Sequence, residues 1–178
     1  MKIRFIINPK SGTGKQNNIE KHITKHLENF EIIYTQKSGD ATRLSKDAVN
    51  KNIDIVIAVG GDGTVNECIK GLINTNTVLG VIPCGSGNGF ANHIGMKRTT
   101  EEAVKQLKYT HIEIIDSCIV NGAPFVNVSG IGFDAHIANL FLKLRKRGFI
   151  SYIKLILKEL SYKANEYIIS YNNIDRKV

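Results

Sequence analysis

The sequence predicts an α/β protein: a Rossmann-like parallel sheet with helices on both faces, followed by the start of a second, β-rich and sandwich-like domain. Two observations support the first part. Between residues 2 and 107, short apolar runs alternate four times with helical patterns, which is typical of βαβ units in a parallel sheet. Three of the four runs end in loops rich in Gly, Ser, Thr or Asp, and open α/β sheets bind their ligands at that edge.

Short apolar runs mark the four strands of the predicted sheet. We expect these strands at residues 2–8, 31–35, 54–59 and 78–82. The third run, DIVIAV, is apolar almost throughout, as a strand covered on both faces requires. Helices on the two faces of the sheet would provide that cover.

The intervening helices are predicted from apolar side chains that recur every three or four residues. Their inner faces are expected to carry Ile19, Ile23, Leu27 and Phe30, then Ala41, Leu44 and Ala48, then Val65, Ile69, Leu72 and Ile73. A turn over residues 60–64 precedes the third helix. A fourth helix begins with the capping-box pattern TTEE at residues 99–102 and runs to Leu107.

The pattern changes near residue 111, so we divide the chain into domains 1–110 and 111–178. Strands are expected at residues 111–120, 125–129 and 166–171, and helices at residues 135–147 and 152–163. Asn121-Gly122 is a strong hairpin signal. The last strand leads into a turn at Asn172-Asn173 with no return strand after it. The sequence therefore predicts a complete first domain and a truncated second one.

Composition narrows the class of protein. The chain has 178 residues, of which 42% are hydrophobic and 22% charged, so a disordered chain is excluded. It has no apolar run of roughly 18 residues and no signal-peptide pattern, so we expect a cytoplasmic protein. Its three cysteines show no CxxC spacing and predict neither a disulfide framework nor a zinc site. The net charge of +8 favours phosphate-bearing partners, with a merely solvated basic face as the alternative.

The first candidate loop, NPKSGTGK, covers residues 8–15. Its glycines allow close backbone approach, its amide N–H groups can hold phosphate, and Lys15 can neutralise charge. The Walker A spacing is absent, and the chain has no GxGxxG, so neither the P-loop nor the ordinary Rossmann fingerprint applies. A simple turn between strand and helix is an equally weighted alternative for this loop.

The second and third loops carry the other polar side chains. GGDGT at residues 60–64 places Asp62 among glycines before a helix. A carboxylate there can bind Mg²⁺ or a bridging water, or act as a base toward a hydroxyl; the alternative is a helix N-cap. In PCGSGNG at residues 83–89, Ser86 and Asn88 can donate hydrogen bonds to phosphate.

NPKSG, GGDGTVNE and PCGSGN, in this order, resemble the catalytic domain shared by diacylglycerol kinases and sphingosine kinases. The resemblance covers at least residues 2–135, because IDSCIVNG and FVNVSGIGFDA are similar to the family's entry into its second domain. It implies a lipid kinase that uses ATP and Mg²⁺ and transfers the γ-phosphate to the hydroxyl of diacylglycerol or of a sphingosine-like base.

The resemblance also implies roles for individual residues. Those expected to bind the nucleotide are Asn8, Pro9, Lys10, Ser11, Gly12, Lys15, Thr35, Gly61, Asp62, Gly63, Thr64, Val65, Asn66, Glu67 and Ser86. Asp62 and Asp116 would be catalytic and would hold the metal, through water. Asn88 and Asp134 would contact the lipid, although Asp134 also fits a helix N-cap. Gly89 and Asn92 depart from the bacterial pattern, which usually has Asp and Arg there.

The expected partners follow from the same resemblance. We expect a lipid substrate, peripheral contact with the inner face of the membrane and no nucleic acid, and we consider a homodimer. The basic run at residues 143–147 can dock on anionic lipid or can simply complement a helix C-terminus. Family chains are longer, and the later acidic residue proposed as their general base is not found here. Two alternatives stay open: a soluble kinase of the NAD kinase type, and a nucleotide-binding fragment without activity.

Overall fold

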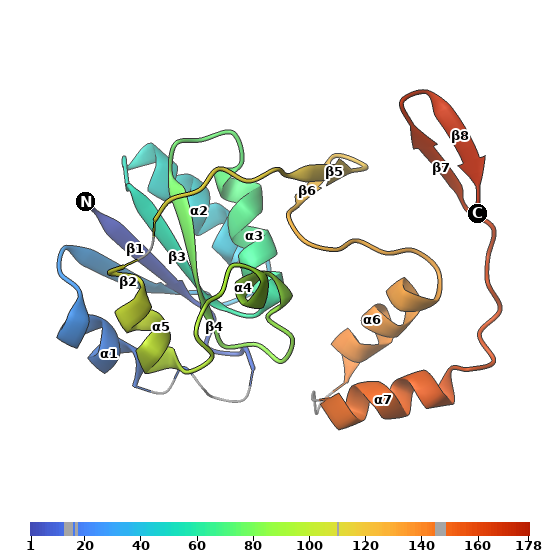
Figure 1. The fold of residues 1–178 in the computed structure, drawn as a ribbon, viewed down its shortest axis with the longest axis horizontal. Coiled ribbons are helices and arrows are strands. Elements are labelled where there is room, and N and C mark those ends of the chain that lie inside the picture. Colours follow the sequence, from blue (N-terminus) through green and yellow to red (C-terminus); the bar gives the residue numbers. More distant parts are fainter. Residues whose placement is uncertain (13–15, 17, 110, 145–148) are drawn as a thin grey trace. The chain divides into compact units, whose positions relative to one another are not determined.

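The computed structural model describes residues 1–12, 16, 18–109, 111–144 and 149–178. The chain forms two compact units, Met1–Val128 and Ser129–Val178, which are labelled by their elements in Figure 1. Each unit is described by itself. The domain division expected after residue 110 stays a prediction.

A four-stranded parallel sheet forms the centre of the first unit. Its strands are β1 (Ile3–Ile7), β2 (Phe30–Tyr34), β3 (Ile55–Gly60) and β4 (Val78–Pro83). They lie in the order β2-β1-β3-β4, and all neighbouring strands are parallel. β1 and β3 are buried almost throughout, because they occupy the middle of the sheet. The predicted α/β class is confirmed.

Helices cover the two faces of this sheet. They are α1 (Ile19–His26), α2 (Asp40–Asn50), α3 (Asp62–Leu72), α4 (Gly89–His93) and α5 (Thr100–Gln106). α2 packs against α3 and α1 packs against α5, and the two pairs lie on opposite faces (Figure 1). Burying apolar side chains between helices and sheet is the main stabilising term of such a layered core.

Two boundaries and one short helix in this unit differ from the sequence prediction. α1 ends at His26, because the chain becomes extended at Leu27 (φ −130°, ψ 154°), and Phe30 begins β2 directly after Asn29, which adopts positive φ. The turn expected over residues 60–64 is shorter, since α3 begins at Asp62. α4 was not predicted, because five residues are too few to show a helical period. The predicted helix start is confirmed, because Thr99 is the N-cap of α5 and its Oγ1 accepts from Glu102 N at 3.4 Å, while the Glu102 carboxylate accepts from the Thr99 hydroxyl.

A buried arginine joins three elements of the first unit. Arg4 on β1 is fully buried. Its Nε lies 2.6 Å from Glu31 Oε1 on β2, and its Nη1 lies 2.8 Å from both Asp47 Oδ2 and the Leu44 carbonyl oxygen on α2. Ion pairs with partly exposed carboxylates compensate the cost of burying the guanidinium. Arg4 therefore fixes how α2 lies on the sheet.

The first unit ends in a short hairpin. Residues 111–117 have no regular structure, so the strand expected over residues 111–120 is reduced to β5 (Cys118–Val120), which pairs with β6 (Ala123–Phe125). Asn121 and Gly122 both have positive φ, 48° and 76°, as a tight two-residue turn requires. The predicted hairpin is therefore confirmed, and β6 packs against α3.

The second unit holds two helices and a hairpin. They are α6 (Phe133–Lys143), α7 (Phe149–Lys158), β7 (Ile168–Tyr171) and β8 (Ile174–Lys177). The expectation that no return strand follows Asn172-Asn173 is wrong. Both asparagines adopt positive φ, and so tight a turn leaves enough chain for β8 to pair with β7.

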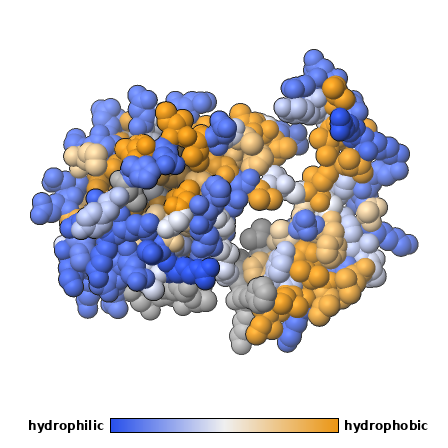
Figure 2. Space-filling view, viewed as in Figure 1, coloured by the Kyte–Doolittle hydropathy of each residue, from blue (hydrophilic) through white to orange (hydrophobic). Residues whose placement is uncertain are grey.

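The second unit exposes many apolar side chains. Ile150, Ile153 and Leu157 on α7 and Leu160 after it are between 40% and 70% exposed, and hydrophobic colour covers much of this unit in Figure 2. Of the basic run, Lys143 ends α6, and residues 145–147 lie outside the described residues. Within the described ranges, no helix is long and apolar enough to cross a membrane.

Candidate active site at the carboxyl edge of the sheet

The ends of the four strands lie in one row. Ile7 pairs with Tyr34 on one side and with Val59 on the other, and Val59 pairs with Ile82. The chain therefore leaves all four strands at the same edge. The residues that directly follow β2 and β4 are still hydrogen-bonded to a neighbouring strand. Thr35 N donates to the Ile7 carbonyl at 2.9 Å, and Cys84 N donates to the Gly60 carbonyl at 2.8 Å. The three loops that the sequence singles out therefore lie side by side.

Glycines bring the backbones of the three loops into contact. A Cβ on Gly12, whose φ is +67°, would lie 1.6 Å from the Cys84 carbonyl oxygen. A Cβ on Gly85 would lie 2.5 Å from the Cα of Gly61. Both distances are too short for any side chain, so the first and second loops each pack directly on the third. This close packing is the structural reason for glycine at these positions.

Asn8 links the first loop to the second. Its Nδ2 donates to Thr64 Oγ1 at 3.1 Å, and its Oδ1 accepts from Lys10 N at 3.0 Å. Ser11 N donates to the Asn8 carbonyl at 3.1 Å, while Pro9 and Lys10 are exposed. The loop is therefore a folded turn with polar groups at its surface. Lys15 lies outside the described residues.

Asp62 is the first residue of α3. The N-cap is Gly61, and no side chain caps the helix, so the N-cap alternative for Asp62 is wrong. Asp62 and Gly63 are exposed, whereas Thr64 and Val65 are buried beneath them. An uncapped helix start presents N–H groups and a positive dipole end, which suit an anion.

The side chain of Asp62 lies over the third loop. Phe90 N, in the first turn of α4, donates to Asp62 Oδ1 at 3.4 Å. A Cβ on Gly87 would lie 3.1 Å from Asp62 Oδ2. Because Gly87 has no side chain, the space next to the Asp62 carboxylate stays open. Ser86, at the tip of this loop, is exposed. The arrangement therefore joins a carboxylate, a helix N-terminus and three polar loops at one edge.

The geometry of these loops agrees with comparisons to known proteins. The family model of the diacylglycerol kinase catalytic domain matches residues 2–120, which include all three loops and two thirds of the chain. This chain belongs to the diacylglycerol kinase catalytic domain family. Both predicted features, the family and the fold class, are thereby confirmed.

Individual relatives support the same assignment. A diacylglycerol kinase of Bacillus subtilis (strain 168) is 37% identical over 141 residues, which are 72% of this chain and 45% of that protein. A crystal structure of a diacylglycerol kinase from Bacillus anthracis str. Sterne matches with a TM-score of 0.73 and 30% identity, over 99% of this chain and 61% of that one. The chain spans about half the length of the curated relatives it matches.

Two site residues predicted from the family resemblance have other partners in this structure. Gly85 N donates to Asn88 Oδ1 at 2.8 Å and Asn88 Nδ2 donates to the Gly85 carbonyl at 2.7 Å, so the amide of Asn88 closes its own loop. Glu67 accepts from Ser38 Oγ and from Ala41 N, both at 3.2 Å, and so caps α2. Lipid binding by Asn88 and nucleotide binding by Glu67 stay predictions.

The loop that precedes α2 is held by a second carboxylate. Asp40 Oδ2 accepts from Gln36 N at 2.9 Å and from Lys37 N at 3.1 Å. These backbone N–H groups, together with Arg43, hold the pKa of Asp40 below its ordinary value. Thr35, which is buried, is followed directly by this loop. Thr35 is thus held by its own hydrogen bond to Ile7 on β1 and by the loop after it, which Asp40 fixes.

Two further acidic residues, Asp116 and Asp134, were predicted to belong to the site. Asp116 is exposed in the segment before β5, and the described residues give it no hydrogen bond or ion pair. Asp134 is the second residue of α6, whose N-cap is Gly132, so its N-cap alternative is wrong. Among the described residues, no group of three or more His, Cys, Asp or Glu side chains is placed to hold a metal. Asp116 and Asp134 therefore stay predictions for the kinase domain.

The structure adds one residue that sequence reasoning missed. Asn127 follows β6, and its Nδ2 lies 2.7 Å from the position of a Cβ on Gly89. The only signal in the sequence is its polarity between Val126 and Val128 in an apolar run. The long-range contact of Asn127 with the third loop leaves no pattern in the sequence.

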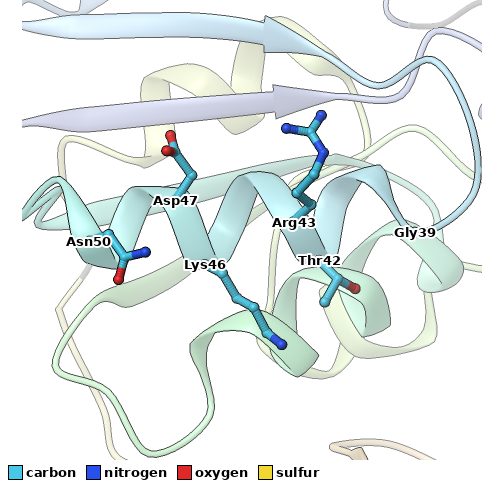
Figure 3. Close-up of a pocket in the computed structure, with 6 residues that line it drawn as sticks. All are labelled: Gly39, Thr42, Arg43, Lys46, Asp47 and Asn50. Carbon is cyan, nitrogen blue, oxygen red and sulfur yellow. The ribbon is translucent and has the colours of Figure 1, made fainter.

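A hollow on the surface of α2 lies outside this site. It is lined by Gly39, Thr42, Arg43, Lys46, Asp47 and Asn50 (Figure 3). All six residues belong to α2 or to its N-cap, and none belongs to the three loops. The candidate site at the sheet edge and this hollow are therefore separate features of the first unit.

Proposed function

We propose that this chain is the nucleotide-binding and catalytic part of an ATP-dependent lipid kinase. The observation that carries the proposal is the contact of three polar loops at one sheet edge, with the uncapped start of α3 and the carboxylate of Asp62 between them. Membership of the diacylglycerol kinase family supports the kinase class. Phosphoryl transfer depends mainly on positioning and charge neutralisation, which such loops supply.

The loops suit the phosphates of ATP. In this proposal the first loop and the N–H groups at Gly61–Gly63 bind phosphate oxygens, while Ser86 donates from the third loop. Asn8 keeps the first two loops together by its hydrogen bond to Thr64. Thr35, at the end of β2, lies at the same edge and would contact the nucleotide.

The residues around Asp62 fit a magnesium ion that arrives with the nucleotide. Mg²⁺ commonly takes one or two carboxylates and completes its shell with water and phosphate oxygens. Asp62 is exposed and accepts one long hydrogen bond, so its oxygens are available. Asp62, with Asp116 as a second proposed partner through water, would hold the ion. Bound there, Mg²⁺ would neutralise charge on the phosphates.

The acceptor is proposed to be a lipid hydroxyl, and the names of the relatives favour diacylglycerol over a sphingosine-like base. Asp62 is placed to accept a hydrogen bond from that hydroxyl as it attacks the γ-phosphate. The exposed apolar residues of α7, with Lys154 and Lys158 on the same helix, support peripheral contact with anionic membranes at the cytoplasmic face. No nucleic-acid partner is proposed.

A transfer assay tests the proposal. The chain is incubated with ATP, Mg²⁺ and mixed micelles that contain diacylglycerol, and parallel assays offer sphingosine or NAD as the acceptor. We expect phosphorylated diacylglycerol from the unaltered chain, loss of product with Asp62→Asn and normal product with the control Asp175→Asn in the β7–β8 hairpin. Phosphorylation of NAD alone, or stabilisation by ATP without turnover on any lipid, would contradict the proposal.

A further inference from the structure

A hydrogen-bond donor and a hydrogen-bond acceptor from distant parts of the sequence lie close to Gly89. A Cβ on Gly89 would lie 2.7 Å from Asn127 Nδ2 and 3.8 Å from Asp62 Oδ1. The amide nitrogen of Asn127 and a carboxylate oxygen of Asp62 therefore both lie within 4 Å of this position at the start of α4. Because Gly89 has no side chain, no atom of a side chain at this residue comes between the two groups and a ligand that approaches them.

The position of Asn127 is set by the elements around it. β6 packs against α3, the helix that begins with Asp62. Val126 is partly buried against the core cluster, which anchors the segment just before Asn127. Asn127 itself is exposed, so its amide is available to a ligand. The fold thus places the amide of Asn127, which lies near the end of the first unit, at the sheet edge where the three loops meet.

The chemistry of this pair identifies what fits between its members. A hydroxyl group donates one hydrogen bond and accepts others. The carboxylate of Asp62 can only accept, and the amide NH₂ of Asn127 can only donate. A hydroxyl placed between them satisfies both groups, whereas an ionised phosphate oxygen, which only accepts, could pair with Asn127 but not with Asp62. We propose that Asn127 is a substrate-binding residue that donates to the oxygen of the acceptor hydroxyl, while Asp62 accepts its proton.

This inference rests on the proposed function and adds a residue to it. Asn127 orients the attacking oxygen toward the γ-phosphate, and its amide keeps its protons throughout the transfer. In this proposal Asn127 contacts the lipid acceptor and does not contact ATP. Loss of its hydrogen bond therefore raises the KM for the lipid and leaves the KM for ATP unchanged. One lost hydrogen bond corresponds to a change of about tenfold.

Three variants in the diacylglycerol assay test this contact. Asn127→Ala removes the donor, and Asn127→Asp keeps the shape but replaces the donor with an acceptor. Both should raise the KM for diacylglycerol by about tenfold or more, with the KM for ATP unchanged. The control Val128→Ala truncates a neighbouring side chain that is 87% exposed and should match the unaltered chain. Thermal unfolding checks that the variants remain folded.

The variant Gly89→Ala tests the position of Asn127 independently. Gly89 is not among the glycines with positive φ, so the backbone accepts alanine, but the new methyl group must displace Asn127. Gly89→Ala should therefore weaken diacylglycerol binding in the unaltered chain and have little further effect in Asn127→Ala. Additive effects, or an unchanged KM for diacylglycerol in Asn127→Ala, would overturn the inference while the kinase proposal stands. No turnover in the unaltered chain would overturn the proposed function first, and this inference with it.

Discussion

The Nδ2 of Asn8 donates a hydrogen bond to Thr64 Oγ1 at 3.1 Å, across 56 residues of sequence. Asn8 follows β1, and Thr64 is buried in the first turn of α3. A Cβ on Gly60 would lie 2.4 Å from the same hydroxyl oxygen, so Thr64 is enclosed by the end of β3 as well. This contact joins the first of the three loops to the helix that begins with Asp62.

Asn8→Ala should loosen the first loop with little loss of overall stability. The variant loses the hydrogen bonds to Thr64 and Lys10, and we expect the free energy of unfolding to fall by about 1 kcal/mol. Affinity for ATP with Mg²⁺ should fall about five- to tenfold, measured by calorimetric titration. Asn50→Ala, which removes an exposed asparagine from α2, is the control. Equal ATP affinity in the two variants would contradict the role of Asn8.

Gly12→Ala should be far more damaging than Gly39→Ala, although both glycines have positive φ. The φ values are +67° and +85°, but a Cβ on Gly12 would meet the Cys84 carbonyl oxygen, whereas a Cβ on Gly39 would meet nothing within 4 Å. Gly39→Ala should cost about 1–2 kcal/mol of backbone strain. Gly12→Ala should cost at least about 1 kcal/mol more, measured by urea unfolding. Similar losses in the two variants would show that the loops do not pack as described.

Glu67→Ala should destabilise the contact between α3 and α2. Glu67 accepts hydrogen bonds from Ser38 and from the backbone N–H of Ala41, and loss of such a cap costs about 1 kcal/mol. Glu67→Gln keeps an acceptor and should lose less. Glu28→Ala, which removes an exposed carboxylate, serves as the control in the same urea titrations. If ATP affinity changes in Glu67→Gln without any change in stability, Glu67 contacts the nucleotide as well.

The stability of the first unit should depend on pH through Asp40. Backbone N–H groups of Gln36 and Lys37 lower the pKa of this carboxyl group. Its stabilising effect is therefore present above its ordinary pKa of about 3.9 and is lost as the pH falls through the lower value in the folded state. The stability difference between the unaltered chain and Asp40→Asn should shrink from pH 6 to below about pH 4. Urea midpoints across this range measure it, and a constant difference would contradict the assignment.

Local patterns were enough to predict the sheet and its loops. Apolar runs placed β1 to β4 correctly to within about two residues, and Asn121-Gly122 fixed the β5–β6 hairpin because its backbone conformation is encoded in two residues. Parallel strands end at a common edge, so the expectation that the three loops lie together followed from the parallel arrangement alone. The conformation of these parts is determined by residues close together in the sequence, so the sequence alone was enough to predict them.

The contacts that were missed join distant parts of the chain. Arg4 is fully buried in β1 only because Glu31 and Asp47 come to it from other elements. Glu67 caps a helix that begins 27 residues before it, and Asn127 reaches the third loop from beyond β6. A single sequence shows the polarity of these residues but not their partners, so packing decides their roles.

The backbone contacts among Gly12, Gly61 and Gly85 also matter for protein engineering. Backbone atoms lie against backbone atoms where these segments meet, so none of the three can shift without moving its neighbour. Anyone grafting this set of loops onto another scaffold would have to transplant all three segments together, with their mutual spacing intact. Replacing one segment by a homologous insert should succeed only when the insert retains its glycine at the joint.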